Sequence, residues 1–107
     1  MSNIYYSPQE FNVTILGEIE FSDGYYQFNT RVFWKGKDGT IYTYRDSGCS
    51  CPTPFEDVSS LDDLTIVNSD DIDWLIGEVR SDVYGYSCTS RADAIQLIHN
   101  IFRGKEN

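Results

Sequence analysis

The chain has 107 residues, of which 40% are hydrophobic and 15% aromatic, and it carries a formal net charge of −9 at pH 7. This length suits one domain with one core, and the apolar content excludes an intrinsically disordered protein in spite of the charge. No apolar run approaches the about 18–20 residues of a transmembrane helix, and the first residues lack the basic start and apolar block of a signal peptide.

The first half of the chain predicts an antiparallel sheet. From residue 11 to 21 apolar and polar side chains alternate, so the apolar ones are expected to share one face of a half-buried strand, with Gly17 as a candidate bulge. Gly24 can adopt the left-handed conformation of a turn into a second strand over residues 25–35. A second turn leads to a third strand over residues 40–45, which completes a three-stranded meander.

The second half predicts helices. Residues 59–64 indicate a short helical turn, and residues 65–68 leave open whether a fourth, edge strand joins the sheet. Apolar residues at helical spacing predict one helix from Ser69 as N-cap and another after Ser90, ending at Gly104. The expected fold class is α+β, a three- or four-stranded antiparallel meander with two C-terminal helices on one face. The expected organisation is a single domain over residues 1–107, with an N-terminal arm (1–9), a β-meander (11–45), a Cys/Pro loop (46–58) and an acidic and helical region (59–107).

The excess negative charge lies in the middle of the chain. Ten carboxylates and one arginine lie between Asp46 and Asp82, a net of nine negative charges, whereas the rest of the chain has seven acids and seven bases. Such a segment repels nucleic acid and membrane phosphates and attracts basic protein surfaces. Three interpretations stay open: a solvated surface, a docking face for a basic protein, or an imitation of the phosphate backbone that blocks a protein which binds nucleic acid.

Trp74 is the candidate anchor of a docking face. On a helical wheel it points nearly opposite the apolar stripe, beside Asp70 and Asp73. An exposed tryptophan among acids fits a partner-binding site, because buried aromatic side chains supply much interface energy. In the alternative, the helix is enclosed on both sides and Trp74 belongs to the core. The candidate partner-binding residues are Trp74, Asp70, Asp73, Asp62, Asp63, Glu56 and Asp57.

Two of the three cysteines, Cys49 and Cys51, stand one residue apart in a proline-containing loop. With Cys88 and His99 they form a candidate Cys₃His set for zinc, although helix geometry separates Cys88 from His99. In the alternative, both cysteines are small buried side chains in a rigid corner whose Phe55 plugs the core. A catalytic Cys49–His99 pair is disfavoured in acidic surroundings, so no catalytic residue and no enzyme activity are predicted. An odd number of cysteines favours a reducing cytoplasm.

The sequence "GCSCPTPFE", from Gly48 to Glu56, follows a predicted strand. Within a match over residues 28–65 it resembles a family of small uncharacterised proteins of actinobacterial phages, which share a Gly-Cys-Ser-Cys-Pro-x-Pro-Phe-Glu core. The resemblance implies a phage accessory protein in a bacterial cytoplasm and brings no known activity. We therefore expect a non-enzymatic protein whose acidic face binds a host protein with a basic surface, with inhibition of a nucleic-acid-binding host factor as one outcome. The alternative is a small zinc-stabilised structural domain of unknown role.

Overall fold

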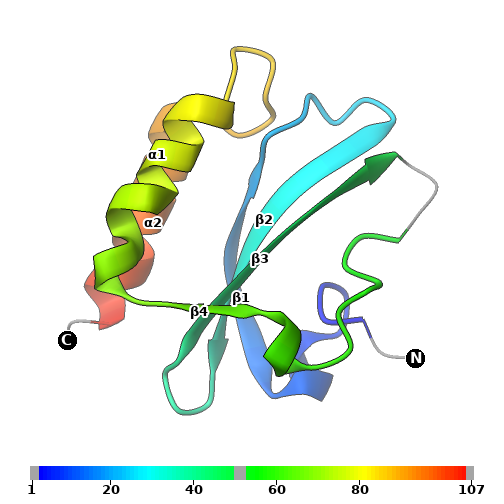
Figure 1. Ribbon diagram of the computed structural model, residues 1–107, viewed down its shortest axis with the longest axis vertical. Coiled ribbons are helices and arrows are strands. Elements are labelled where there is room, and N and C mark those ends of the chain that lie inside the picture. The colour runs from blue at the N-terminus through cyan, green and yellow to red at the C-terminus, as the bar shows by residue number, and fades with distance from the viewer. Residues whose placement is uncertain (1–2, 50–52, 106–107) are drawn as a thin grey trace.

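The central sheet is antiparallel and consists of β1 (Val13–Glu20), β2 (Gln27–Gly36), β3 (Ile41–Cys49) and β4 (Thr65–Val67). The computed structural model describes residues 3–49 and 53–105 of the chain (Figure 1). The strand order is β1-β2-β3-β4, so the three long strands form the expected meander and β4 adds an edge strand on β3. The predicted α+β fold is thereby confirmed in its four-stranded form.

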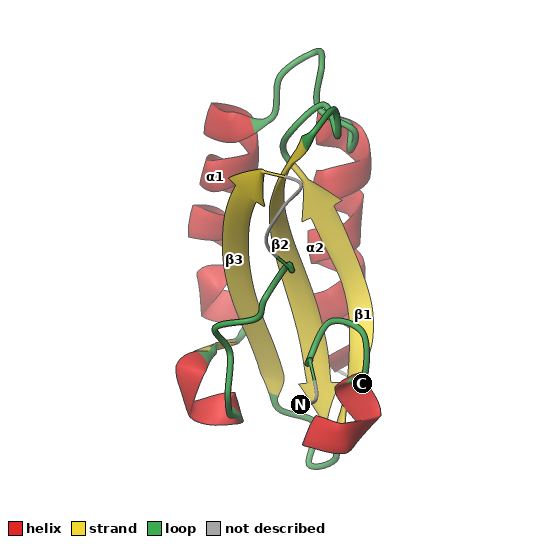
Figure 2. Ribbon diagram, turned by 90° about the vertical axis from the view of Figure 1, so that its right-hand side faces the viewer, coloured by secondary structure: helices red, strands yellow, loops and turns green. Residues whose placement is uncertain are grey.

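Two helices cover one face of this sheet, as the sequence predicts. α1 spans Ile72–Asp82 and α2 spans Arg91–Lys105, and both lie behind the sheet in Figure 2. The Ser90 hydroxyl accepts a hydrogen bond from the backbone N–H of Asp93 (3.1 Å), which confirms the expected N-cap of α2. The helix continues through Gly104, so the prediction that it ends there is wrong. A single glycine lowers helix propensity without removing a backbone hydrogen bond.

α1 begins later than predicted. The residues before it form a 3-10 helix, η3 (Ser69–Asp71), and the N-cap of η3 is Asn68 rather than the expected Ser69. The Asn68 side chain accepts from the N–H of Asp70 (2.9 Å), and the Asp71 carboxylate accepts from the N–H of Asn68 (2.8 Å). This reciprocal arrangement satisfies backbone donors that the start of a helix otherwise leaves unpaired.

A bulge in β1 transfers the strand's apolar side chains from one face of the sheet to the other. The register against β2 shifts between Ile15 and Gly17, where the glycine suggested a bulge. Val13 and Ile15 pack on one face, whereas Ile19 packs on the other. One inserted residue reverses the in-and-out alternation of a strand. The expectation that the apolar residues of 11–21 share one face is therefore wrong.

The face under the helices contains a mainly aliphatic core. Leu75 and Val79 of α1 and Ile98 of α2 are fully buried with Ile19 and Phe33 of the sheet. Burial of each such side chain contributes about 1.5–3 kcal/mol to folding. This packing fixes which side of α1 faces solvent, and hence where Trp74 and its acidic neighbours lie.

The opposite face is covered by irregular segments, which face the viewer in Figure 2. The N-terminal arm buries Ile4, whose carbonyl oxygen accepts a hydrogen bond from the Trp34 indole N–H (3.2 Å). The loop after β3 buries Phe55 against Trp34, and the Asp46 carboxylate accepts from the Phe55 N–H (2.9 Å). The prediction that Phe55 plugs the core is confirmed. Two 3-10 helices complete this layer: η1 (Pro8–Phe11) and η2 (Leu61–Asp63), the latter capped by Ser60.

Candidate functional site

Trp74 lies in the first turn of α1 with 43% of its surface exposed. Its indole N–H donates to Oδ1 of Asp71 (2.8 Å), and the guanidinium carbon of Arg31 lies 5.4 Å from the ring centroid. The alternative in which α1 is enclosed on both sides and Trp74 belongs to the core is therefore wrong. The two contacts hold the ring in one orientation and leave part of it accessible to a partner.

Two of the mid-chain carboxylates are neutralised by arginines of the sheet. Glu78 of α1 receives two hydrogen bonds from Arg31, from Nε to Oε1 (2.6 Å) and from Nη2 to Oε2 (2.9 Å). Nη1 of Arg45 lies 3.1 Å from Oε2 of Glu78 and 2.6 Å from Oδ2 of Asp82. The hydrogen bond from Arg45 lowers the pKa of Asp82. The negative charge that α1 presents to solvent is thus smaller than its sequence suggests.

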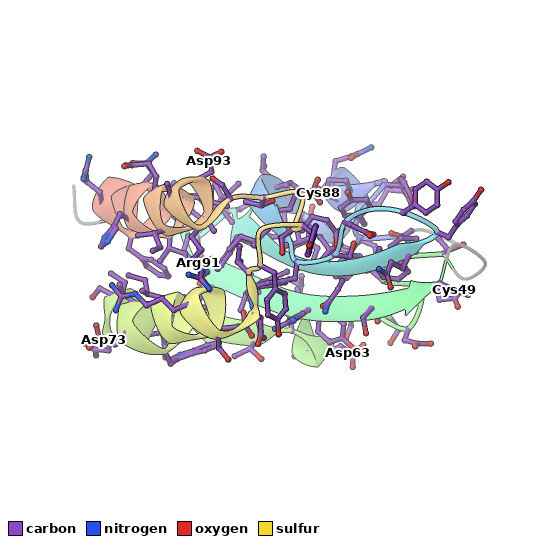
Figure 3. All side chains as sticks on the ribbon, turned by 90° about the horizontal axis from the view of Figure 1, so that it is seen from above. Cys49, Asp63, Asp73, Cys88, Arg91 and Asp93 are labelled. Carbon is purple, nitrogen blue, oxygen red and sulfur yellow. The ribbon has the colours of Figure 1, made fainter. Side chains whose placement is uncertain are left out.

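The aspartates on either side of β4 are not neutralised in this way. Within residues 3–49 and 53–105, no lysine or arginine forms an ion pair with Asp70 or Asp73, and both carboxylates are exposed. Figure 3 shows Asp63 and Asp73 on one long side of the molecule and Asp93 on the opposite side. We call this side the acidic surface. Its members are Asp62 and Asp63 of η2, Asp70 and Asp71 of η3, and Asp73 and Trp74 of α1.

Hydrogen bonding keeps two of these aspartates ionised. Backbone and hydroxyl donors of Ser59 and the N–H of Ser60 lower the pKa of Asp63. The N–H of Asn68 and the indole of Trp74 lower the pKa of Asp71. Between the two groups lies β4, whose Ile66 is exposed. The acidic surface therefore combines negative charge with the exposed aromatic side chain of Trp74.

Glu56 and Asp57, also predicted to bind the partner, are placed elsewhere. Both are exposed on the loop whose neighbouring Phe55 and Val58 pack under the second sheet face. This loop and η2, which carries Asp62 and Asp63, belong to the layer on the second face, whereas Trp74 belongs to the helix layer on the first face. Of these acids, Asp63 is seen on the same long side of the molecule as Asp73 (Figure 3). Asp70 lies in η3 and Asp73 in the first turn of α1, next to Trp74 along the chain. The carboxylate that contacts the indole is that of Asp71, which was not among the predicted partner-binding residues.

The structure does not assemble the candidate zinc ligands that it describes. Cys49 ends β3, Cys88 lies in the loop between the helices, and His99 is exposed on α2; Figure 3 shows the two cysteines well apart. Cys51 lies outside the described residues. Among the residues that are described, no group of three or more His, Cys, Asp or Glu side chains could hold a metal ion. The alternative expectation of a buried Cys49 is wrong, because its side chain is exposed.

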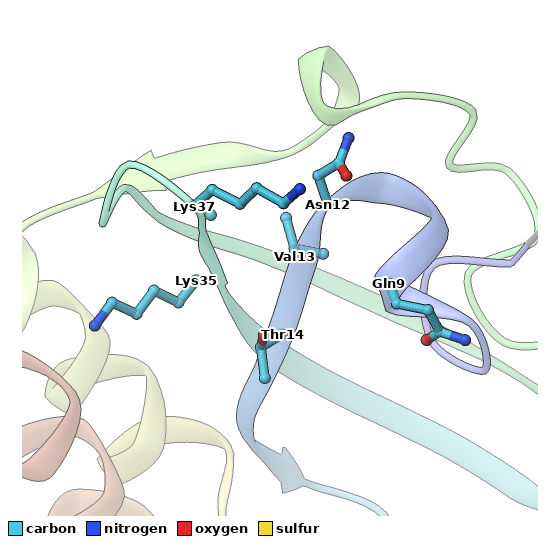
Figure 4. A pocket seen from close by; sticks show the side chains of 7 residues that line it. Gln9, Asn12, Val13, Thr14, Lys35 and Lys37 are labelled. Atoms are coloured by element: carbon cyan, nitrogen blue, oxygen red, sulfur yellow. The ribbon is translucent and has the colours of Figure 1, made fainter.

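A basic hollow of about 350 Å³ lies where η1 meets the start of β1 and the end of β2 (Figure 4). Its lining includes Lys35 and Lys37, and Figure 4 shows that Lys37 extends toward Asn12 whereas Lys35 extends away. The two ammonium groups therefore do not converge on one point, as they would in an anion site. None of the residues singled out from the sequence lines this hollow.

Sequence reasoning missed a group of exposed tyrosines at one end of the molecule. Tyr25 and Tyr26 lie in the β1–β2 loop, and Tyr84 and Tyr86 lie in the loop between α1 and α2. Tyr25 and Tyr26 were predicted to begin the second strand, which instead starts at Gln27. Tyr84 and Tyr86 lie in a segment with no regular apolar spacing. Such segments give no indication of which loops meet in space.

The molecule is thus an α+β protein with an open four-stranded antiparallel sheet and two helices on one face. The chain belongs to a family described as a domain of unknown function (DUF7574), whose family model matches residues 2–105. No curated protein and no solved structure matches the chain. None of the helices described is long and apolar enough to pass through a membrane.

Proposed function

We propose that this protein is a non-enzymatic binding protein whose acidic surface docks on a basic surface of another protein. The observation that carries the proposal is the exposure of Trp74 beside carboxylates that have no cationic partner among the described residues. In line with the resemblance to phage proteins, the partner is a host protein in the bacterial cytoplasm. A host factor that binds nucleic acid through the same basic surface would be inhibited.

The acidic surface has the two properties that such docking requires. Its aspartates attract a basic surface over a distance of about a Debye length, which raises the association rate. Trp74 is partly desolvated and held by Asp71, so little ordering is required when a partner covers it. Binding to free nucleic acid or to an anionic membrane is disfavoured by the same charge.

Three carboxylates between Asp46 and Asp82 have a lowered pKa because of hydrogen bonds within the fold. Asp63 and Asp71 accept backbone hydrogen bonds at helix starts, and Asp82 is paired with Arg45. Each lowered pKa therefore has a cause in the fold itself.

An affinity purification from an actinobacterial lysate tests the proposal. Trp74→Ala should weaken capture of the partner about 30-fold or more, as loss of a central aromatic anchor does. Asp70→Asn combined with Asp73→Asn should weaken it less and reduce its dependence on salt. Asp93→Asn is the matched control, because Asp93 lies on the opposite side of the molecule. An identical set of captured proteins with Trp74→Ala would eliminate the acidic surface as the docking site.

A further inference from the structure

The two loops at one end of the molecule, β1–β2 and α1–α2 (Figures 1 and 2), carry two exposed tyrosines each. Tyr25 and Tyr26 of the β1–β2 loop are 72% and 71% exposed, and Tyr84 and Tyr86 of the α1–α2 loop are 65% and 87% exposed. Single exposed apolar residues are common, but such a group on adjacent loops marks a binding surface. Tyrosine offers a large contact area at a low entropic cost.

Hydrogen bonds fasten the two loops to each other. The Ser87 hydroxyl donates to the Phe21 carbonyl oxygen (2.6 Å) and accepts from the Tyr84 N–H (2.9 Å). The Cys88 N–H donates to the Ser22 carbonyl oxygen (2.8 Å). The tyrosines are therefore presented by a preorganised frame, which lowers the entropy lost on binding.

Between the loops lies an open hollow of about 290 Å³. Its lining residues include the exposed Tyr84 and Tyr86, together with Asp23, Gln27 and Asn29, and they include no lysine or arginine. The Phe21 side chain is buried, and Asn29 accepts a hydrogen bond from Arg45 (2.8 Å). The Tyr25 N–H and the Gln27 side chain donate to Oδ1 of Asp23 and lower its pKa. The hollow is thus lined by two exposed tyrosines and one ionised aspartate.

This lining suits an organic cation. The negative faces of aromatic rings attract guanidinium and ammonium groups, whereas they repel anions. A calcium ion requires six to eight oxygen ligands, roughly, and the hollow supplies one carboxylate. A planar guanidinium can stack on a ring and also donate to a carboxylate and to amide oxygens.

The molecule already shows this stacking at the edge of the hollow. The guanidinium carbon of Arg45 lies 3.9 Å from the centroid of the Phe21 ring. The positive charge of Arg45 is compensated by Glu78 and Asp82. It therefore leaves Asp23 available to a second cation.

We propose that this hollow binds the guanidinium group of an arginine side chain presented by a partner protein. The site is separate from the acidic surface, since Trp74 lies in the first turn of α1 and Tyr84 lies beyond its last residue. It adds a second point of contact and does not depend on docking at Trp74.

A titration of the whole ¹⁵N-labelled chain with N-acetyl-argininamide, followed by NMR, tests the proposal. N-acetyl-citrullinamide, which has nearly the same shape and no charge, is the matched probe, and N-acetyl-lysinamide tests an ammonium group. We expect saturable shifts at residues 21–27 and 84–87 with the arginine probe and none with citrulline. Equal shifts with citrulline or lysine, shifts confined to other residues, or none up to the solubility limit would each overturn it.

Matched variants locate the site. Tyr86→Leu keeps an apolar side chain without a π face and should raise the dissociation constant of the arginine probe roughly two- to fivefold, whereas Tyr86→Phe should leave it unchanged. Asp23→Asn should also raise it, because asparagine can still accept the Tyr25 N–H but carries no charge. Trp74→Ala should have no effect, which separates this site from the acidic surface. Wild-type affinity in both Tyr86→Leu and Asp23→Asn would refute the assignment.

Discussion

The two faces of the sheet are covered in different ways and hold different kinds of core. Under the helices, the buried side chains are mainly aliphatic, such as Leu75, Val79 and Ile98. Under the irregular segments, buried aliphatic side chains are joined by a cluster of rings: Trp34 and Phe55 meet edge to face with centroids 5.7 Å apart, and Tyr5 stacks on Phe55 at 5.3 Å. A helix brings a side chain to the core at nearly every turn. The irregular segments have no such period, and the largest side chain that they bury is Phe55.

The two faces also differ in how their covering layer is attached through polar groups. The helix layer is held by the ion pairs of Arg31 and Arg45 with Glu78 and Asp82. The loop layer is held by hydrogen bonds to backbone groups, from Trp34 to the Ile4 carbonyl and from the Phe55 N–H to Asp46. The helix face should therefore respond to charge changes, and the loop face to loss of aromatic volume.

The largest effect on stability is expected at Phe55, the largest buried side chain of the loop layer. Phe55→Ala should lower the free energy of unfolding by about 3–5 kcal/mol, because it removes a buried ring that contacts Tyr5, Trp34 and Tyr44. Urea denaturation followed by tryptophan fluorescence measures the loss. Phe55→Leu is the control and should lose less, since most of the volume stays. A loss below about 1 kcal/mol in Phe55→Ala would show that the loop does not seal this face.

The helix face was more predictable from sequence than the loop face, for a physical reason. Regular elements bury residues with a fixed period, so both helices and the three long strands could be located from apolar spacing. The burial of Ile4 follows no period and was missed. The helical wheel predicted that Trp74 points away from the apolar stripe, but it did not predict how much of the side chain is exposed. The exposure depends on which other segments pack nearby.

Long-range pairing limited the prediction of the candidate site. Glu78 and Asp82 were counted as part of the exposed charge, yet their partners Arg31 and Arg45 lie 47 and 37 residues away in the chain. The spacing of residues in the sequence indicates which side chains are neighbours within one helix or strand. It does not indicate which side chains pair between two different elements. The tyrosine loops were missed because only folding brings the β1–β2 loop to the loop between the helices.

An intermediate effect is expected at the bulge that joins the two faces. A Cβ atom on Gly17 would lie 2.5 Å from Cδ1 of Leu97 on α2. Gly17→Ala should therefore lower the free energy of unfolding by about 1–2 kcal/mol, because a flexible side chain must move aside. Adding Leu97→Ala should remove that penalty, so a double-mutant cycle with thermal unfolding should show coupling. Additive losses would place the cost in the backbone instead of in the contact with α2.

The smallest effect on stability is expected when the pH is lowered and Asp82 on the helix face becomes protonated. The pKa of Asp82 is lowered in the folded protein by Arg45, so the unfolded chain binds a proton at higher pH than the folded one. The stability that Asp82 adds is present above its ordinary pKa and is lost as the pH falls from about 4 through the folded-state value. Because its side chain is 37% exposed, that contribution should stay below about 1 kcal/mol and shrink at high salt. Urea unfolding of the wild type and of Asp82→Asn should give different free energies of unfolding at roughly pH 6. This difference should vanish under strongly acidic conditions, roughly pH 2. A difference that does not change with pH would mean that the Arg45 pair does not anchor α1.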